Sequence, residues 1–514
     1  MGPVENIIIL LSSSLCLCLL FLVIKFLHKV WWTPIRIQSS LQSQGIKGPS
    51  YRFIYGNTKD ILNMKKEFMG RPMDLSHQIF PRLQPHSYSW VNIYGKNYLY
   101  WHGSKAQFVV SDPEFVKEIL NNRDKAYPKI DIEGHLKKLL GDGLLTSEGE
   151  KWVKLRKLAN HAFRVESLKN MIPAMIASVE TMLERWRQYE GKELEVFEEF
   201  RILTSEVISR TAFGSSYLEG KDIFDMLMQL SIIMVRDAFK IKLPGLSKFV
   251  KSSTDIETDK LEQGIRDSIV KIIKKRENAM NGEVDNFGTD FLGLLLKSNH
   301  DDDENNRITV DDMVDECKTF YIAGHETTST LLTWTILFLA IHTDWQEKAR
   351  QEVLKLFGKQ HPNSEGIGRL KMMNMIINES LRLYPPVVSF LRKVKQEVKL
   401  KKFILPANIN LIIPALAIHH DPQIWGEDAL LFKPERFSEG VAKATNNNPA
   451  VFFPFGLGSR SCAGTNFAIN EAKIALTMIL QRYAFTLSPA YIHSPVQVLT
   501  VRPQHGVQVM LHAI

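Results

Sequence analysis

The stretch that decides the fold of this chain reads FGLGSRSCAG and runs from Phe455 to Gly464. It places three glycines and one arginine around a single cysteine, Cys462. Glycine adopts positive φ at no steric cost and lets the backbone approach a bulky partner closely. A loop that must press a thiolate against a flat metal macrocycle needs this freedom, whereas a buried structural cysteine does not. Cys462 is therefore the candidate metal ligand of the chain.

The loop meets the pattern Phe-x-x-Gly-x-Arg-x-Cys-x-Gly at every fixed position, and this pattern resembles the haem-binding loop of the cytochrome P450 family. The resemblance implies that Cys462 is the proximal ligand of iron in haem b (iron protoporphyrin IX). It also implies that Phe455 and Arg460 contact the haem, with Arg460 at a propionate. A thiolate ligand pushes electron density to iron and favours cleavage of the O–O bond.

A second motif, AGHETT, lies at residues 323–328. The helical pattern around it starts at Val310 and continues to about Ile341 without a proline, and a helix of this length crosses a whole domain. A threonine can hydrogen-bond a carbonyl one turn earlier and bend its helix. The motif resembles the oxygen-activation segment of the family, which implies catalytic roles for Thr327, as a hydrogen-bond donor to oxygen, and for Glu326, as a proton relay from solvent. His325 is expected to be a core or solvent histidine rather than a metal ligand.

A charged pair, Glu379 and Arg382, ends a helical pattern that Pro385 and Pro386 stop. Spacing of i,i+3 places both charges on one helix face. A surface ion pair would contribute little, but apolar flanks predict burial, where further partners are required. The string resembles the family's Glu-x-x-Arg motif, which implies a structural triad completed by Arg436.

Further haem contacts follow from the same resemblance. Trp152 and Arg156 lie four residues apart and share a helix face. They match a Trp-x-x-x-Arg helix whose side chains reach a haem propionate, and an arginine suits a carboxylate because its planar fork gives bidentate contacts. Arg392, placed by its spacing after Arg382, is predicted to bind a propionate as well.

Composition limits the function classes. The chain has 514 residues, of which 45% are hydrophobic and 23% charged, so it buries a sizeable core. Its net charge of +8 is too mild to predict nucleic-acid binding; it fits an ordinary solvated surface or a basic face for an acidic electron donor. The four cysteines show no disulfide framework, which favours a reducing compartment.

The N-terminus predicts a membrane anchor. Residues 7–24 carry no charge, which reaches the length of a spanning helix. Lys25, Lys29 and Arg36 follow this run, so the positive-inside rule predicts a single-pass protein with its catalytic domain in the cytosol, at the endoplasmic reticulum membrane. A cleaved signal peptide is the alternative, but a basic n-region is lacking. We expect an anchor over residues 1–30, a linker over 31–49 and a haem-thiolate domain over 50–514.

The expected fold is mainly α with small β-sheets, the cytochrome P450 fold, preceded by one transmembrane helix. Alternating aromatic and aliphatic residues over 89–110 predict a small β-meander. Ser147-x-x-Glu150 predicts a capping box at the start of one helix, and Thr309-x-x-Asp312 predicts the start of another. Short β patterns occupy 398–413 and 496–511, interrupted by proline or glycine.

The resemblance implies a monooxygenase that inserts one oxygen atom from O2 into a lipophilic small molecule, such as a terpenoid, a hormone or a fatty acid. A dinucleotide fingerprint is lacking, so an NADPH-cytochrome reductase flavoprotein is the expected electron donor. Apolar pocket walls are predicted at Leu136–Leu145 and at the side chains Phe320, Tyr321, Val387, Val388 and Phe390. Two alternatives remain: a haem-thiolate isomerase or dehydratase that rearranges hydroperoxides without O2 or reductase, and a haem carrier without catalysis.

Overall fold

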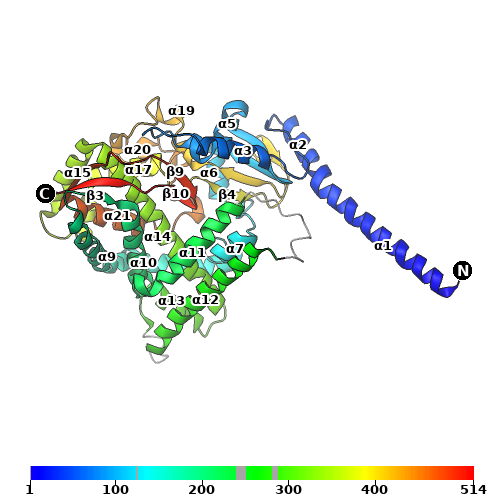
Figure 1. Ribbon diagram of the computed structural model, residues 1–514, viewed down its shortest axis with the longest axis horizontal. Helices are drawn as coiled ribbons and strands as arrows, with labels where there is room; N and C mark the ends of the chain where they lie inside the picture. Colours follow the sequence, from blue (N-terminus) through cyan, green and yellow to red (C-terminus); the bar gives the residue numbers. More distant parts are fainter. Residues whose placement is uncertain (1, 123–124, 239–250, 280–286) are drawn as a thin grey trace. The chain divides into compact units, whose positions relative to one another are not determined.

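The computed structural model describes residues 2–122, 125–238, 251–279 and 287–514. Over these residues the chain forms two compact units. The first combines residues 1–71, 84–130 and 391–414, and the second combines residues 72–83, 131–390 and 415–514. Helices dominate and the sheets are small, which confirms the predicted fold class (Figure 1).

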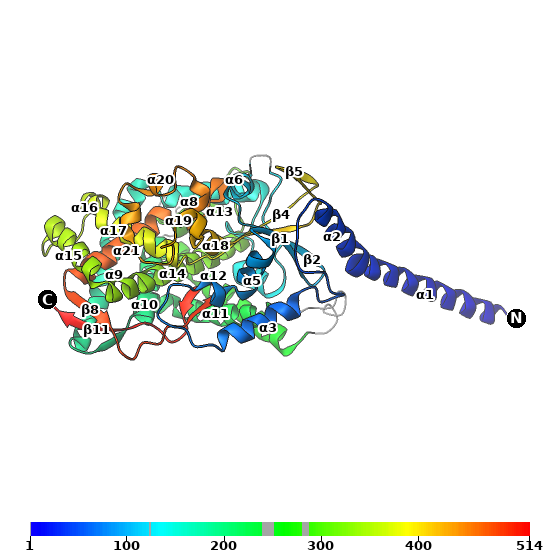
Figure 2. The same cartoon turned by 90° about the horizontal axis from the view of Figure 1, so that it is seen from above.

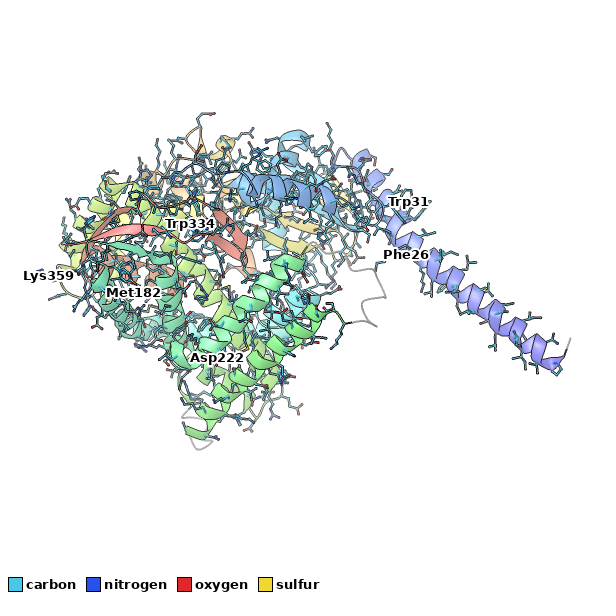
Figure 3. All side chains as sticks on the ribbon, viewed as in Figure 1. Phe26, Trp31, Met182, Asp222, Trp334 and Lys359 are labelled. Atoms are coloured by element: carbon cyan, nitrogen blue, oxygen red, sulfur yellow. The ribbon has the colours of Figure 1, made fainter. Side chains whose placement is uncertain are left out.

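The first unit begins with a continuous helical rod. α1 (Pro3–Leu27) passes through a π-helical turn, His28–Trp32, into α2 (Thr33–Ser43). The stretch Asn6–Ser43 is long and apolar enough to cross a membrane, with a mean hydropathy of 3.0 in its most apolar window. The apolar side chains of its first part, from Ile7 to Ile24, are exposed, and Figure 3 shows this part of the helix extending beyond Phe26.

The interval 31–49 differs from the simple linker that the sequence suggested, because residues 33–43 form α2. Leu41 of this helix is fully buried. The Gln38 side-chain oxygen accepts hydrogen bonds from the Tyr51 backbone N–H at 2.8 Å and from Trp101 Nε1 at 3.2 Å. The helix ends at Gly45, whose φ of 86° is favourable for glycine. Contacts within the first unit thus hold the segment after the anchor.

One four-stranded sheet lies in the first unit, in the order β1 (Asn97–His102), β2 (Lys105–Val110), β7 (Asn410–Ile413), β4 (Phe390–Lys393). β1 and β2 form an antiparallel hairpin, and β7 runs parallel to β2. The remaining elements are α3 (Thr58–Met69), α5 (Pro85–Tyr94), α6 (Pro113–Asn121), β5 (Val398–Leu400) and β6 (Phe403–Leu405).

The meander predicted over 89–110 is right for the hairpin and wrong before it, because residues 89–94 belong to α5. Pro85 at the first turn fixes a helical φ, and Gly95 at φ 93° ends the helix. Trp90 buries its ring against Tyr98 and Tyr100 of β1. The aromatic residues therefore pack from a helix onto the hairpin rather than alternating along a strand.

The second unit is mostly helical. Its longer helices are α7 (Gly134–Leu140), α8 (Gly149–Ala162), α9 (Val165–Trp186), α10 (Val196–Phe213), α11 (Tyr217–Asp237), α12 (Ser253–Ala279), α13 (Phe291–Asn299), α14 (Val310–Ile341), α15 (Thr343–Phe357), α17 (Lys371–Leu383) and α21 (Thr465–Leu480). Short helices are α4 (Phe80–Leu83), α16 (Ser364–Arg369), α18 (Ala415–His419), α19 (Pro422–Trp425) and α20 (Val441–Ala444), with 3₁₀ turns at Arg187–Tyr189, Pro434–Phe437, Pro449–Val451 and Gly458–Arg460.

α14 lies among the other helices of this unit (Figure 2), and its residue Trp334 is buried (Figure 3). Its bounds agree with the prediction, and the predicted capping box at Thr309 and Asp312 is formed. α10 packs closely on α14 at Gly324, where an added Cβ would lie 2.7 Å from Ile208 Cδ1. The glycine in the AGHETT motif is therefore required by helix packing.

The capping box predicted at Ser147 is not formed. The N-cap of α8 is Glu148, without a side-chain hydrogen bond, and Gly149 follows with φ of 64°. The Ser147 backbone carbonyl accepts a hydrogen bond from Arg460, at 2.8 Å. The helix thus begins one residue later than the capping-box pattern predicts.

The C-terminal β patterns are confirmed. β3 (Glu193–Glu195), β11 (Gln508–Ala513) and β8 (Tyr483–Leu487) form one sheet in that order. β9 (Pro495–Val498) and β10 (Thr500–Pro503) form a separate antiparallel hairpin in which Thr500 pairs with Val498. Leu499 alone makes the turn, at φ 59°.

Candidate active site

The cysteine loop is closed by its own backbone. The Cys462 N–H donates to the Phe455 carbonyl at 2.8 Å, and Gly456 and Gly458 adopt φ of 77° and 75°. Gly464 stands directly before α21, and a Cβ there would lie 4.0 Å from Cys462 Sγ. The two positive-φ glycines turn the chain, while the third leaves one side of the sulfur open.

The thiol of Cys462 faces an internal space. Protein surrounds it closely enough that burial raises its pKa, yet its side chain is exposed. A raised pKa together with an exposed side chain is typical of a group that lines a cavity rather than the outer surface. The Gly464 backbone N–H, the Thr465 hydroxyl and the Arg156 guanidinium oppose the rise in pKa, and the N-terminus of α21 favours negative charge at this place. The surroundings therefore suit a thiolate once a cation is bound to it.

Two arginines and a tryptophan gather beside this loop. The Arg460 guanidinium lies 4.1 Å above the Trp152 ring, and its Nη2 is 2.7 Å from Glu148 Oε2. Arg156 Nη1 donates to the Ser461 carbonyl at 2.6 Å. α8 thus brings Trp152 and Arg156 to the cysteine loop from far away in sequence. The guanidinium groups of Arg460 and Arg156 suit the carboxylates of a porphyrin.

Arg392 belongs to the first unit. Its side chain is 3% exposed, and its Nη1 donates to the Leu391 carbonyl at 2.8 Å. Its role at a haem propionate stays a prediction.

α14 presents an accessible face in the middle of an otherwise buried helix. Ala323 is exposed and Thr327 is half-buried, and i,i+4 spacing places them on one side. Thr327 Oγ1 donates to the Ala323 carbonyl at 2.7 Å, which is the back-bond expected from the sequence. α14 packs against α21, which follows the cysteine loop. An accessible thiol and an accessible helix face on packed elements are the surroundings that a flat haem requires.

Glu326 does not lie on that face. Its side chain is buried, and its Oε2 accepts from Arg502 Nε at 2.9 Å and from Thr500 Oγ1 at 3.2 Å. Burial alone would raise the pKa of Glu326, but the hydrogen bond of His325 and the Arg502 guanidinium lower it to about 2. A direct relay from bulk solvent is therefore not the arrangement seen.

His325 is a core histidine, as expected. Its Nδ1 lies 3.1 Å from Thr204 Oγ1 and 3.0 Å from Ser205 Oγ, and its ring packs against Phe224. Among the described residues, His, Cys, Asp and Glu side chains form no group of three or more that could hold a metal ion. A single thiolate whose metal arrives inside a macrocycle is consistent with this finding.

The Glu379–Arg382 pair is fully buried, and its guanidinium is bidentate on the carboxylate at 2.7 Å. Arg436 completes the triad at 3.5 Å from Glu379 Oε1. Arg382 also donates to the carbonyls of His419 and Ala429, at 2.9 and 2.7 Å. These partners satisfy the charges that burial would otherwise destabilise.

The predicted apolar pocket walls are in part core packing. Phe320 is buried and stacks on Phe163 at 5.5 Å, and Tyr321 stacks on Phe213 at 4.2 Å. Phe390 packs against Phe453, and a Cβ on Gly456 would lie 3.3 Å from its ring. Phe390 therefore lies beside the cysteine loop, within the same unit.

Sequence reasoning missed Arg502 and Thr500. Both come from β10, after the last recognised motif, and no local pattern marks them as partners of Glu326. A lone arginine in a strand gave no usable signal, because the contact depends on how the hairpin packs against α14.

Comparisons with known proteins agree with this site. The family model described as Cytochrome P450 matches residues 76–509. The chain is 68% identical over 507 residues to "Cytochrome P450 CYP749A22" of Panax ginseng, which covers 98% of this chain and 97% of the relative. It is 42% identical over 501 residues to "11-oxo-beta-amyrin 30-oxidase" of Glycyrrhiza uralensis, with 95% and 94% covered. It is 39% identical over 502 residues to "Cytochrome P450 734A1" of Arabidopsis thaliana, with 96% and 95% covered.

The chain belongs to the cytochrome P450 family, and it is a haem-dependent monooxygenase of the oxidoreductase class. The apolar N-terminal helix fits the membrane anchor expected of it.

Proposed function

We propose that this enzyme inserts one oxygen atom from O2 into a lipophilic small molecule of the terpenoid, hormone or fatty-acid type. Electrons would come from NADPH through an NADPH-cytochrome reductase flavoprotein. The observation that carries the proposal is the accessible Cys462 thiol in the loop before α21, a helix that packs against α14, together with the accessible Ala323–Thr327 face of α14.

Cys462 would hold haem b through its sulfur, and Phe455 would line the loop around it. Arg460, Trp152 and Arg156 would contact the propionates, and Arg392 is the further propionate candidate. Arg460 and Arg156 now bind Ser147, Glu148 and the Ser461 carbonyl, so each guanidinium is held in place by the fold. Bound haem supplies the one-electron and dioxygen chemistry, and the protein supplies binding, orientation and electrostatics.

Thr327 and Glu326 are the proposed catalytic residues. The Thr327 hydroxyl lies on the accessible face of α14, and rotation away from the Ala323 carbonyl would let it donate a hydrogen bond into the open space. Glu326 is its neighbour in the chain and carries the nearest carboxylate of the motif. Reduction of O2 to water and product consumes protons, so one group must position oxygen and another must deliver protons.

The substrate class rests on the relatives and on the pocket. One relative is named as an oxidase of 11-oxo-beta-amyrin, which is a bulky lipophilic polycycle. Apolar residues such as Phe390 lie beside the cysteine loop. We therefore place polycyclic terpenoids first among the compounds to be tested, before hormones and fatty acids.

The proposed location is the endoplasmic reticulum membrane, with one pass through α1 and the catalytic domain in the cytosol. Lys25, Lys29 and Arg36 follow the apolar run, which supports this orientation. Trp31 and Trp32, 48% and 62% exposed, suit the headgroup region.

The test uses the full-length enzyme with purified reductase, NADPH and a set of candidate lipids. We expect oxygenated product that depends on both NADPH and reductase. Turnover of lipid hydroperoxides without either would instead indicate an isomerase or dehydratase, and haem binding without any turnover would indicate a carrier.

A substitution at Thr327 tests its proposed catalytic role. Thr327→Ala is expected to consume NADPH at a rate comparable to the wild type while releasing peroxide in place of product, because the hydroxyl no longer positions oxygen. Measurement of product and peroxide per NADPH checks this result. Unchanged coupling would remove Thr327 from the catalytic residues.

A further inference from the structure

Glu326 is held by a hairpin that is distant in sequence. Its Oε2 contacts Arg502 through Nε, at 2.9 Å, and through Nη2. Thr500 of the same strand donates to this oxygen at 3.2 Å and accepts from Thr330 Oγ1 at 3.1 Å. All four residues are buried, with at most 8% of each residue exposed. Removed from water, each of these contacts is stronger than its surface equivalent.

The hairpin turns within one residue, Leu499, whose φ is 59°. A leucine in the left-handed region is uncommon, and such an outlier persists only where the surrounding structure enforces it. Leu499 lines a small cavity together with Glu326, His325 and Tyr321. The strained turn thus stands next to the carboxylate that β10 holds.

The second oxygen of Glu326 faces His325, whose Nε2 lies 3.4 Å from Oε1. The Ser205 hydroxyl lies 3.0 Å from Nδ1 of this histidine. If Nδ1 accepts that hydroxyl proton, Nε2 carries the ring proton near Glu326. The groups that face the carboxylate are then Arg502 and Thr500 from β10 and His325 from α14. Ser205 of α10 contacts His325, and α11 contributes Met228, whose Sδ lies 3.0 Å from Arg502 Nη1.

We propose that Arg502 is a positioning residue which keeps Glu326 charged and off the accessible face of α14, so that the β9–β10 hairpin sets the pH range in which this carboxylate passes protons. The inference rests on the proposed role of Glu326 in proton transfer. A carboxylate whose pKa is about 2 carries no proton near neutral pH, so its pairing with Arg502 must loosen before it takes one up. Without Arg502 burial would dominate, and the pKa of Glu326 would rise.

The first test measures the pair itself, independently of turnover. Holoenzymes carrying Arg502→Gln, Glu326→Gln and both substitutions are unfolded with denaturant near pH 7. We expect Arg502→Gln to lower the denaturant concentration at the midpoint of unfolding. When Glu326→Gln is already present, the same substitution should lower this midpoint by less than half as much. Arg350→Gln is the matched control, because Arg350 is also 8% exposed but bonds Gln346 and the Tyr483 carbonyl. Its effect should be the same in both backgrounds. Equal effects of Arg502→Gln in both backgrounds would overturn the proposal.

The second test measures product formed per NADPH from about pH 6 to about pH 9. We expect the profile of Arg502→Gln to move to higher pH by about one unit or more, and that of Arg502→Lys, which keeps the charge, to stay near the wild type. An unshifted Arg502→Gln profile overturns the proposal while the monooxygenase function stands. Absence of NADPH-dependent product from the wild type would instead overturn the proposed function.

Discussion

Glu316 and Glu326 lie on the same helix, α14, and both are buried, but their surroundings favour opposite charge states. Glu316 Oε1 accepts the backbone N–H of Leu144, and burial raises the pKa of Glu316 to about 8. Glu326 is also desolvated, yet His325 and Arg502 lower its pKa to about 2. Burial therefore makes a carboxyl neutral unless a buried cation accompanies it.

The two surroundings also differ in what they support. A Cβ on Gly143 would lie 2.7 Å from Glu316 Oε1, and Asp315 Oδ2 accepts the Asp142 backbone N–H at 2.8 Å. The loop that leads into α8 thus rests on the first half of α14, and α8 carries Trp152 and Arg156. The part of the helix around Glu316 thus supports the helix that carries the proposed haem contacts, whereas the part around Glu326 faces the hairpin.

The largest effect is expected where a buried carboxylate has two arginines. Glu379→Ala leaves the buried Arg382 without its anion, whereas Arg436 keeps its pairing with Asp428. We therefore expect a loss of about 3–5 kcal/mol in the free energy of unfolding and a lower haem content. Denaturant unfolding and haem absorbance measure both. Glu347→Ala is the control, since Glu347 pairs with Arg350 at the same i,i+3 spacing but is 53% exposed, and it should cost less than about 1 kcal/mol. Similar losses for the two variants would contradict the account.

A somewhat smaller loss is expected at the single-arginine site. Glu326→Gln removes the charge opposite Arg502, and we expect a loss of about 3 kcal/mol near neutral pH because that guanidinium is then buried unpaired. The loss should shrink in acid, since the stabilisation by Glu326 is present above its ordinary pKa near 4.5 and disappears as the pH falls towards 2. A loss that does not depend on pH would show that packing, rather than charge, is responsible.

The change at the neutral site has the opposite sign, and it is the smallest of the three near pH 5 and grows as the pH rises. The raised pKa of Glu316 means that its stabilisation is complete below about 4.5 and is lost as the pH rises towards 8, because the unfolded chain releases the proton first. Glu316→Gln mimics the protonated acid, so it should match the wild type near pH 5. Above that pH, the free energy of unfolding of Glu316→Gln should exceed that of the wild type by about 1 kcal/mol more for each pH unit, up to about pH 8. Unfolding curves at several pH values decide this, and parallel curves would refute it.

The sequence predicted those parts of the site that depend on local pattern. The glycine-rich loop around Cys462, the bounds of α14 and the Glu379–Arg382 pair follow from spacing and residue type, because neighbours in the chain enforce them. The resemblance singled out Arg460 and Trp152 as haem contacts, and the structure places their side chains together; their role at the haem stays a prediction.

Features that depend on distant packing were not predictable in this way. The partnership of Arg502 with Glu326 needs the β9–β10 hairpin in place. The predicted capping box at Ser147 is absent, since Glu148 is the N-cap of α8 and Gly149 follows at positive φ. The strand predicted over residues 89–94 is replaced by a helix that begins at Pro85.

The most direct test is whether Cys462 supplies the thiolate ligand of the haem iron. The reduced, carbon-monoxide-bound absorption spectrum is to be measured for the wild type, Cys462→Ser and Cys317→Ser, the last being a buried cysteine of α14 that serves as the control. We predict the thiolate signature in the wild type and in Cys317→Ser, and its loss in Cys462→Ser. A Cys462→Ser enzyme that keeps the thiolate signature would contradict the central claim.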